Sequence, residues 1–181
     1  DLKGQFNLKF KADDFLINYD QFTFAANYNV NQLKYKDPDL SSDDTHTQQG
    51  ASGQFIHNLY FNETFSLLYG SQLNFDYMES TQTGTNNRIN SGSYIEGFLS
   101  LNDFFIFQPA IRYDYFSDIG HIVNYHGGIN IKISENDIIK LNGNTAFRAP
   151  DFNDLYWPSD LWAEGNPDLT PEKAYNGDIG Y

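Results

Sequence analysis

The stretch FSLLYGSQLNFDYME, residues 65–79, alternates side chains of two kinds with a period of two. Its odd-numbered positions are mainly aromatic or aliphatic, from Phe65 to Tyr77, and its even-numbered positions are mainly polar or small. Because successive side chains of a β-strand point to opposite faces, this pattern predicts a strand with one apolar and one polar face. The run is much longer than the roughly 5–6 residues that are usual for a strand in a globular protein.

The same alternation recurs along most of the chain and predicts an all-β protein. The clearest further runs are residues 6–10, 22–30, 104–117, 122–134 and 138–148. Two runs, 53–61 and 89–101, alternate less cleanly. Together these runs predict about eight antiparallel strands connected in sequence.

The predicted connections alternate in length. Tight polar turns are predicted at 11–14, 62–64, 102–103 and 135–137. Longer loops are predicted at 35–50, 80–88 and 149–173, with 118–121 as a short exception. Short turns at one end and long loops at the other are typical of an antiparallel up-and-down transmembrane β-barrel. No segment has the apolar spacing of a regular helix.

Composition narrows the classes of function. The net charge is −13, with only 11 Lys and Arg residues, so nucleic acid is not an expected partner. The chain has no cysteine, which excludes disulfides and thiolate metal sites. Aromatic residues make up 17% although the mean hydropathy is −0.56. A membrane barrel combines these two properties because it spreads aromatic side chains over its outer surface.

A soluble all-β binding module would also alternate, so the pattern leaves that alternative open. Two details favour the barrel. The apolar faces place aromatic residues near strand ends and aliphatic residues nearer the middle, as expected for interfacial girdles. The opposite faces are rich in Asn, Gln, Ser and Gly and carry few charges, which suits a polar barrel interior.

Three motifs carry a resemblance to a known family. They are RYDYFSDIG at 112–120, FRAPDFNDLYWP at 147–158 and GNPDLTPEKAYNGDIGY at 165–181. In composition and spacing they resemble segments in the barrels of TonB-dependent outer-membrane receptors. The resemblance implies that residues 1–181 are a partial barrel domain, about eight strands of a barrel of about 22. It also implies that the next strand begins near Thr170–Glu172.

The resemblance implies a function in active nutrient uptake across the outer membrane of a Gram-negative bacterium. The partners would be outer-membrane lipid, the nutrient, and the TonB energy-transducing complex, which acts through an N-terminal plug region absent from this chain. The Trp157–Pro158 pair is similar to the vitamin B12 receptor branch and implies a corrinoid cargo, with an iron–siderophore complex or haem next. A non-transporting structural or adhesive outer-membrane barrel is the alternative from another class.

An open sheet of eight strands leaves two unpaired edges, and unpaired backbone groups are costly in lipid. We therefore expect this chain to be part of a larger receptor. A closed eight-stranded barrel is the competing expectation.

The family motifs also imply structural roles for individual residues. Pro150 lacks a backbone donor and should end a strand, and the Arg148 guanidinium beside it can pair with nearby carboxylates. Asn153 and the following Asp154 suit a turn or short helical cap, and Asn166 can close a turn. The complete motif set is Arg112, Arg148, Pro150, Asn153, Leu155, Tyr156, Asn166, Pro167, Pro171 and Glu172.

Exposed aromatic residues on a loop can stack on a large planar nutrient, although packing of the loop itself explains them equally well. The ligand-binding candidates are Tyr156, Trp157 and Trp162. Four acidic residues lie close together earlier in the chain and offer hard oxygen ligands for calcium: Asp37, Asp39, Asp43 and Asp44. No other cofactor is expected. The four histidines form no zinc pattern and no catalytic motif occurs, so an enzyme is not expected.

Overall fold

The computed structural model describes residues 1–37, 42–102 and 104–181, and these form one antiparallel sheet in which each strand pairs with its neighbours in sequence. The all-β, up-and-down prediction is confirmed. There are nine strands, one more than alternation alone predicts, because a last strand begins at Glu172. The strands are β1 (Leu2–Asp13), β2 (Asp20–Asp37), β3 (Ser42–Tyr60), β4 (Phe65–Ser80), β5 (Gly84–Leu101), β6 (Phe105–Phe116), β7 (Gly120–Lys132), β8 (Ile138–Arg148) and β9 (Glu172–Gly180).

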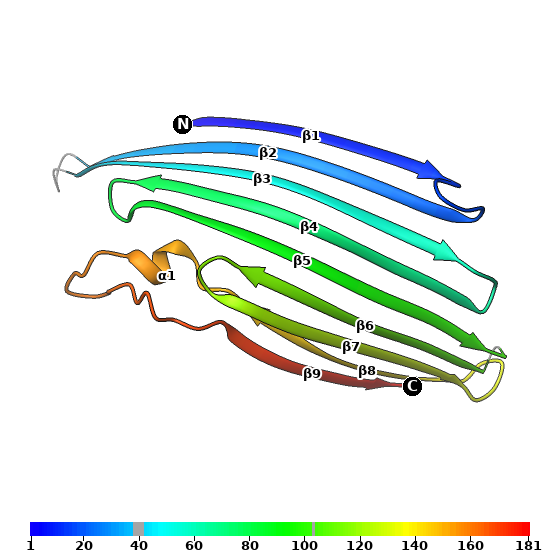
Figure 1. Ribbon diagram of the computed structural model, residues 1–181. Helices are drawn as coiled ribbons and strands as arrows, with labels where there is room; N and C mark the ends of the chain where they lie inside the picture. Colours follow the sequence, from blue (N-terminus) through cyan, green and yellow to red (C-terminus); the bar gives the residue numbers. More distant parts are fainter. Residues whose placement is uncertain (38–41, 103) are drawn as a thin grey trace.

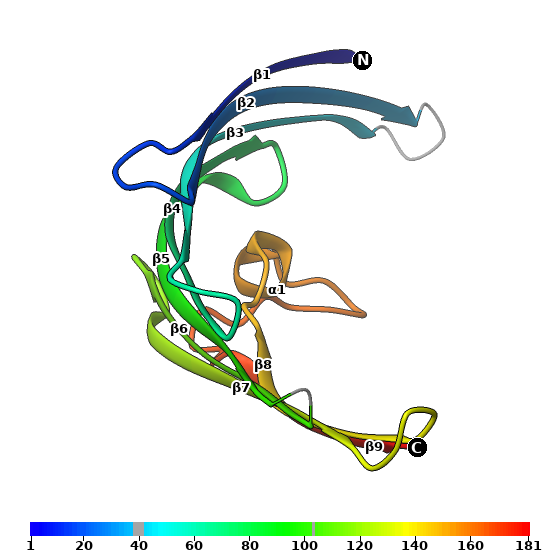
Figure 2. The ribbon, with the colours of Figure 1, turned by 90° about the vertical axis from the view of Figure 1, so that its right-hand side faces the viewer.

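The sheet is bent into an open trough (Figures 1 and 2). A short helix, α1 (Phe152–Tyr156), lies on the concave side near one end. That end, where the segment 149–171 connects β8 to β9, is called the long-loop end here. The opposite end, where β1 turns into β2 and β3 into β4, is the short-turn end.

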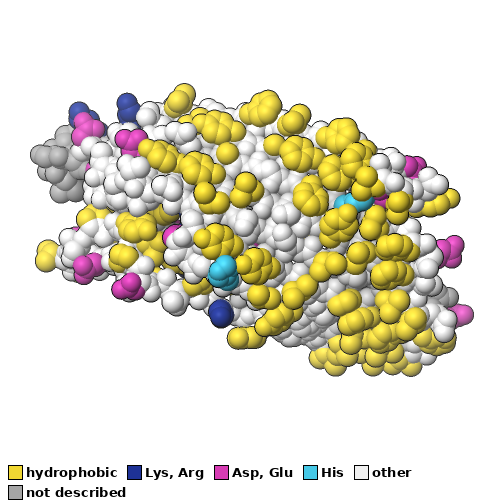
Figure 3. Space-filling model, in the orientation of Figure 1, with side chains coloured by type: hydrophobic (Ala, Val, Ile, Leu, Met, Phe, Trp, Pro, Cys, Tyr) yellow, Lys and Arg dark blue, Asp and Glu magenta, His cyan; other side chains and the backbone are white. Residues whose placement is uncertain are grey.

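The two faces of the trough differ in chemistry as the alternation predicts. The register places apolar pairs such as Phe10 and Phe24, or Ile95 and Ile111, opposite each other on exposed positions of the convex face. Figure 3 views this face and shows hydrophobic side chains spread across it, with charged groups gathered toward the two ends. The concave face carries polar pairs, for example Asn74, whose amide donates to Asn90 over 2.9 Å.

The tight polar turn predicted at 11–14 is wrong, because β1 runs to Asp13 and the turn occupies residues 14–19 with an apolar centre. Two of the predicted loops are also wrong because the strands continue through them. β2 runs to Asp37 and β3 begins at Ser42, so most of the predicted loop 35–50 is strand. Likewise only residues 81–83 separate β4 from β5, where the prediction placed a loop at 80–88. In both places the side chains are polar on both faces, so the alternation disappears although the hydrogen-bonded ladder continues.

β8 loses one of its two partners along its length. It pairs with β9 from Lys140 to Arg148, but with β7 only as far as Asn144, opposite His126. At the separation, the Thr145 hydroxyl accepts a hydrogen bond from the backbone N–H of Tyr125 at 3.0 Å and donates to the Asn124 side-chain oxygen at 3.2 Å. A side chain therefore replaces the ladder where the two strands diverge.

The few apolar side chains that are fully buried in the described part of the chain are Met78, Phe116, Ile122 and Leu155. Leu155 belongs to α1 and Met78 borders it, so the small core lies between the helix and the wall. Across the described ranges, no helix is both long and apolar enough to span a membrane.

Candidate functional site

The segment 149–171, called the docking segment below, begins where the ladder ends. β8 stops at Arg148, and Pro150 follows without a backbone donor, as predicted. Asp151 then caps α1: its carboxylate accepts from the N–H of Asp154 at 2.8 Å, and the Asp154 carboxylate accepts from the N–H of Asp151 at 3.0 Å. This reciprocal capping box stabilises the start of a helix of only five residues. The prediction of a turn or short helical cap at Asn153 and Asp154 is confirmed.

A cation–aromatic stack holds α1 against the wall. The guanidinium of Arg88, near the start of β5, lies 5.1 Å from the ring centre of Phe152 and 5.9 Å from that of Phe116. Its Nε and Nη2 donate to the carboxylate of Asp118 at 2.6–3.0 Å. Arg88 is 8% exposed, so its charge is neutralised inside the protein and not in solvent.

Sequence analysis did not select Arg88 or Asp118 as site residues. A signal was nonetheless present, since Arg88 is a lone cation in the polar run NNRIN, on a strand face that otherwise carries few charges. Its partner lies thirty positions away in sequence. Only the register of β5 with β6 brings the two together.

Residues 165–171, the last part of the docking segment before β9, contain the turn predicted at Asn166. Its side-chain oxygen accepts from the N–H of Asp168 at 3.0 Å, while its own N–H donates to the carbonyl of Asp154 at 2.9 Å. Pro167 lies in this turn, and Pro171 immediately precedes β9. A Cβ atom on Gly165 would lie 2.7 Å from the backbone nitrogen of Tyr156, so no other residue fits there without displacement.

The two motif arginines have different surroundings. Arg148 is exposed and lies between Asp154 of α1, at 3.4 Å, and Glu172 of β9, at 3.7 Å. Each contact involves a single oxygen, so Arg148 bridges two elements without forming a bidentate fork. Arg112, on β6, forms a fork with Asp114 at 2.7 Å and lies over the ring of Tyr94 at 5.6 Å.

Two of the aromatic ligand candidates, Trp157 and Trp162, are held in place by Asp160, which was not among the site residues predicted from the sequence. The carboxylate of Asp160 accepts from the indole Nε1 of Trp157 at 3.2 Å and from the backbone N–H groups of Trp162 and Ala163 at 2.7 and 2.8 Å. We call residues 157–163 the tryptophan loop. The hydrogen bonds from Trp162, Ala163 and Trp157 hold the pKa of Asp160 below its usual value.

The three candidates do not share one surface. Trp162 is 92% exposed at the tip of the tryptophan loop, beside an equally exposed Leu161. Trp157 instead borders a cavity of about 250 Å³ against the wall, together with Asn153, His46 and Met78. Tyr156 stacks on Phe152 within α1, with ring centres 6.4 Å apart.

A second cavity of about 280 Å³ lies beside the first, between Phe152, Arg88 and Asp76. Each cavity is at or below the lower end of the roughly 300–1,000 Å³ that is usual for a small-molecule site. Both cavities are therefore small for a large nutrient, whereas Trp162 is presented to solvent on the docking segment.

The acidic group proposed for calcium is only partly described. Asp39 lies outside the described residues, and Asp37 is placed only as the last residue of β2. Asp43 pairs with Lys36 across the ladder at 3.4 Å, and Asp44 accepts from Thr81 and Gln82 at 2.9 and 2.8 Å. Neighbouring residues of a strand point to opposite faces, so Asp43 and Asp44 do not share one ion in this geometry. The described ranges contain no cluster of three acidic or histidine side chains suited to a metal.

Comparison with known proteins identifies the barrel. The whole chain, residues 1–181, matches the family described as TonB dependent receptor-like, beta-barrel. It is 27% identical over 184 aligned residues to the vitamin B12 transporter BtuB of Vibrio vulnificus, covering 90% of this chain and 29% of that protein. It is 31% identical over 99 residues to the vitamin B12 transporter BtuB of Photobacterium profundum, covering 55% of this chain and 16% of that one.

Solved structures show the same fold at lower identity. The siderophore receptor PirA of Pseudomonas aeruginosa superposes with a TM-score of 0.80 at 17% identity, covering 98% of this chain and 34% of PirA. The ferric enterobactin receptor PfeA superposes with a TM-score of 0.77 at 12% identity, covering 98% of this chain and 32% of PfeA. The chain thus spans about a third or less of the length of these relatives. It belongs to the family of TonB-dependent receptors, in their β-barrel domain.

Proposed function

We propose that this chain forms part of the barrel wall of an outer-membrane receptor that takes up a scarce nutrient with energy from TonB. One observation carries the proposal: hydrophobic side chains are spread over the convex face of the sheet, polar pairs such as Asn74 and Asn90 lie on its concave face, and the docking segment is folded over the concave side at one end. An apolar outer face suits lipid, and a polar inner face suits contact with a plug or with the nutrient. Family membership supports both roles.

The preferred cargo is vitamin B12 or a related corrinoid. It rests on the relatives with the higher sequence identity, which are vitamin B12 transporters and which the chain matches over up to 90% of its length. The superposed siderophore receptors are only 12–17% identical and support the fold alone. Trp162, almost fully exposed at the long-loop end, is the side chain best placed to contact a large planar cargo.

The test is equilibrium binding of cyanocobalamin to the complete receptor that contains this chain, purified in detergent. Saturable binding, retained when ferric enterobactin is added in excess, is the expected result. Binding of ferric enterobactin without binding of cyanocobalamin would replace the corrinoid with an iron complex. Binding of neither, together with extraction of the receptor without detergent, would support the soluble binding module.

The adhesive-barrel alternative makes a different prediction about transport. A transporter should accumulate labelled cyanocobalamin in cells, and deletion of TonB should abolish this accumulation while surface binding persists. Calcium is proposed as an accessory ion at the acidic group that includes Asp44. Its test is the same binding measurement with calcium and then with a chelator.

A further inference from the structure

The turn between β1 and β2, residues 14–19, leaves the wall on its convex side and folds back over it (Figure 2). Its central side chains are apolar and open to the surroundings: Phe15 is 47% exposed, Leu16 67% and Ile17 47%. Two other turns at the same end of the sheet have polar centres, Asn-Glu-Thr at 62–64 and Ser-Glu-Asn at 134–136. Single exposed apolar side chains, Phe61, Phe104 and Ile133, lie in other turns at this end, whereas this turn presents three in succession.

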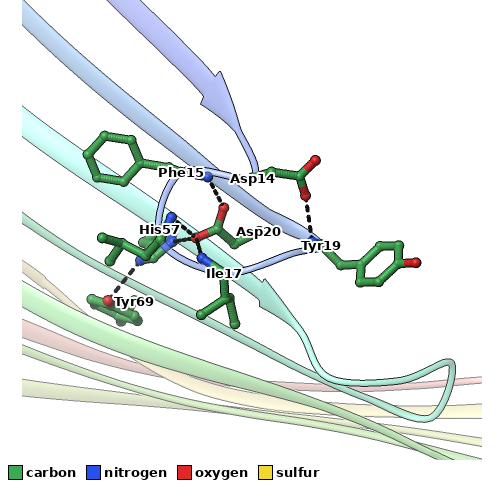
Figure 4. A network of polar contacts seen from close by, with 8 residues as sticks. Asp14, Phe15, Ile17, Tyr19, Asp20, His57 and Tyr69 are labelled. Atoms are coloured by element: carbon green, nitrogen blue, oxygen red, sulfur yellow. Dashed lines mark hydrogen bonds and ion pairs between the residues drawn. The ribbon is translucent and has the colours of Figure 1, made fainter.

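Five of the six backbone N–H groups of this turn, those of residues 14–17 and 19, donate within the protein. Figure 4 shows the carboxylate of Asp20 at the centre of the turn, where it accepts from the N–H groups of Phe15, Leu16 and Ile17 at 2.5, 2.9 and 3.3 Å. The N–H of Asp14 donates to the carbonyl of Asp20 at 2.9 Å, and the N–H of Tyr19 donates to the carboxylate of Asp14 at 2.6 Å. The turn thus leaves few backbone donors that need water, as a segment in contact with hydrocarbon requires.

The carboxylate of Asp20, which accepts these hydrogen bonds, is buried. Asp20 is 1% exposed, and its Oδ2 lies 2.7 Å from Nε2 of His57, which is 2% exposed. The other ring nitrogen of His57 lies 2.8 Å from the hydroxyl of Tyr69. Phe15 covers the site from outside and stacks on Phe22 with ring centres 4.6 Å apart.

The turn is continuous with the apolar convex face. Phe22, on which Phe15 stacks, is followed two positions along β2 by Phe24, which is exposed and pairs with the exposed Phe10 of β1. A contiguous exposed apolar surface of this kind marks an interaction site. Because this surface is continuous with the convex face, which is assigned to lipid, we assign lipid to it as well.

We propose that residues 14–19 form a membrane anchor that inserts Phe15, Leu16 and Ile17 among the phospholipid chains at the short-turn end of the barrel. Asp20, which is paired with His57, favours insertion by accepting from three backbone N–H groups of the turn. The inference rests on the proposed function, since it requires the convex face to contact lipid. The experiment below separates failure of the anchor from failure of that function.

The chain contains no cysteine, so single nitroxide labels can be placed in it through cysteine substitution. The complete receptor would be reconstituted in vesicles of phosphatidylethanolamine and phosphatidylglycerol. Labels would be placed at Leu16→Cys in the anchor, at Leu73→Cys on the exposed convex face of β4, and at Glu63→Cys in the polar turn at the same end. Power saturation would compare collision with oxygen, which enters lipid, and with a water-soluble nickel chelate.

The expected ratio of oxygen to nickel collision at Leu16 is several-fold above that at Glu63 and close to that at Leu73. A Leu16 ratio equal to that of Glu63, with Leu73 still in lipid, would overturn the anchor and leave the proposed function standing. A Leu73 ratio equal to that of Glu63 would overturn both. Shielding of Leu16 from both reagents would show a protein partner on the turn and would also overturn the lipid assignment.

The role of the carboxylate has its own test. With the label at Leu16, Asp20→Asn places an amide group where backbone donors converge, so nickel collision should rise several-fold. The matched control is Asp13→Asn, which removes the same charge from an exposed neighbour outside the network and should change nothing. Unchanged collision in Asp20→Asn would contradict the role given to Asp20. If Asp20→Asn does not fold, the collision ratio measured at Leu16→Cys in the otherwise unaltered chain still tests the anchor.

Discussion

The guanidinium of Arg88 lies 5.1 Å from the ring centre of Phe152, and this contact fixes the helix of the docking segment to the wall of the barrel. The two residues come from elements far apart in sequence, β5 and α1. Arg88 is neutralised by Asp118 and also lies 5.9 Å from the ring centre of Phe116. The helix α1 is too short to be stable alone, so its position depends on such contacts.

Arg88→Ala should therefore release α1 while leaving the sheet intact. Removing one partner of a largely buried ion pair costs about 3 kcal/mol, since the other charge is left without compensation. The expected result is faster hydrogen exchange at the amides of Leu155 and Trp157, with exchange in β3 and β4 unchanged. Arg148→Ala is the control, because its contacts are exposed and should contribute less than about 1 kcal/mol. Equal effects of the two variants would contradict the assignment.

Gly165→Ala should displace residues 165–171 from α1. The added Cβ would lie 2.7 Å from the Tyr156 nitrogen and closer still to that of Trp157, and such overpacking costs about 1–3 kcal/mol. Limited proteolysis should then cut the docking segment more rapidly. Gly127→Ala is the matched control, since a Cβ there meets nothing within 4 Å. Proteolysis at the same rate in both variants would show that the close approach is not required.

The tryptophan loop should lose its order in acid. Its hydrogen bonds lower the pKa of Asp160 in the folded state, so their contribution is fully present above the usual Asp pKa of about 4. It is lost as the pH falls through the lowered folded-state value. Both tryptophans of residues 1–181, Trp157 and Trp162, lie in this loop, so a change in intrinsic fluorescence between pH 6 and pH 2 measures this transition. Asp160→Asn should abolish it, and its persistence in that variant would assign it to another carboxylate.

Trp162→Ala should weaken cobalamin binding by roughly two- to tenfold, the range expected for loss of one aromatic stacking contact. The matched control is Leu161→Ala, which removes an equally exposed apolar neighbour and should leave affinity unchanged. Trp157→Ala should act differently, by loosening the loop, because Trp157 borders the wall cavity and bonds to Asp160. An unchanged affinity in Trp162→Ala would remove it from the binding site.

Calcium binding by the acidic group stays a prediction, and the geometry sharpens it. Asp43 is paired with Lys36, and Asp44 points to the other face of β3. We expect any calcium dependence of cargo affinity to be lost in Asp44→Asn and retained in Asp43→Asn. Titration of both variants with calcium checks this. Retention of the calcium effect in Asp44→Asn would exclude that residue as a ligand.

Sequence predicted the strands where one face is apolar and failed where both faces are polar. Residues 65–79 alternate clearly, and β4 occupies residues 65–80. By contrast, Lys36 and Asp43 are opposite each other in the β2–β3 ladder although neither lies in an alternating run. Pairing of the backbone sustains such strands, and backbone pairing leaves no trace in side-chain periodicity.

The residues of the candidate site divide in the same way into those that the sequence predicts and those that it does not. Pro150, Asn166 and Pro171 act locally, so their effects on the chain were predictable from the residues themselves. Arg88 and Asp20 act through partners thirty or more positions away, Asp118 and His57. Their roles follow from strand register, which alternation alone does not specify.

The separation of β8 from β7 at Thr145 gives the wall two mechanical parts. Over residues 138–144, a displacement of β8 is transmitted to β7 through the hydrogen bonds that pair the two strands. Over residues 145–148, the described backbone pairing joins β8 to β9 alone, and side chains make the described contacts to the preceding strands, the Thr145 hydroxyl on β7 and the Phe147 ring on Phe116 of β6. A force on the docking segment therefore reaches the wall by two routes, through the β8–β9 pair and through the contact of Phe152 with Arg88 on β5.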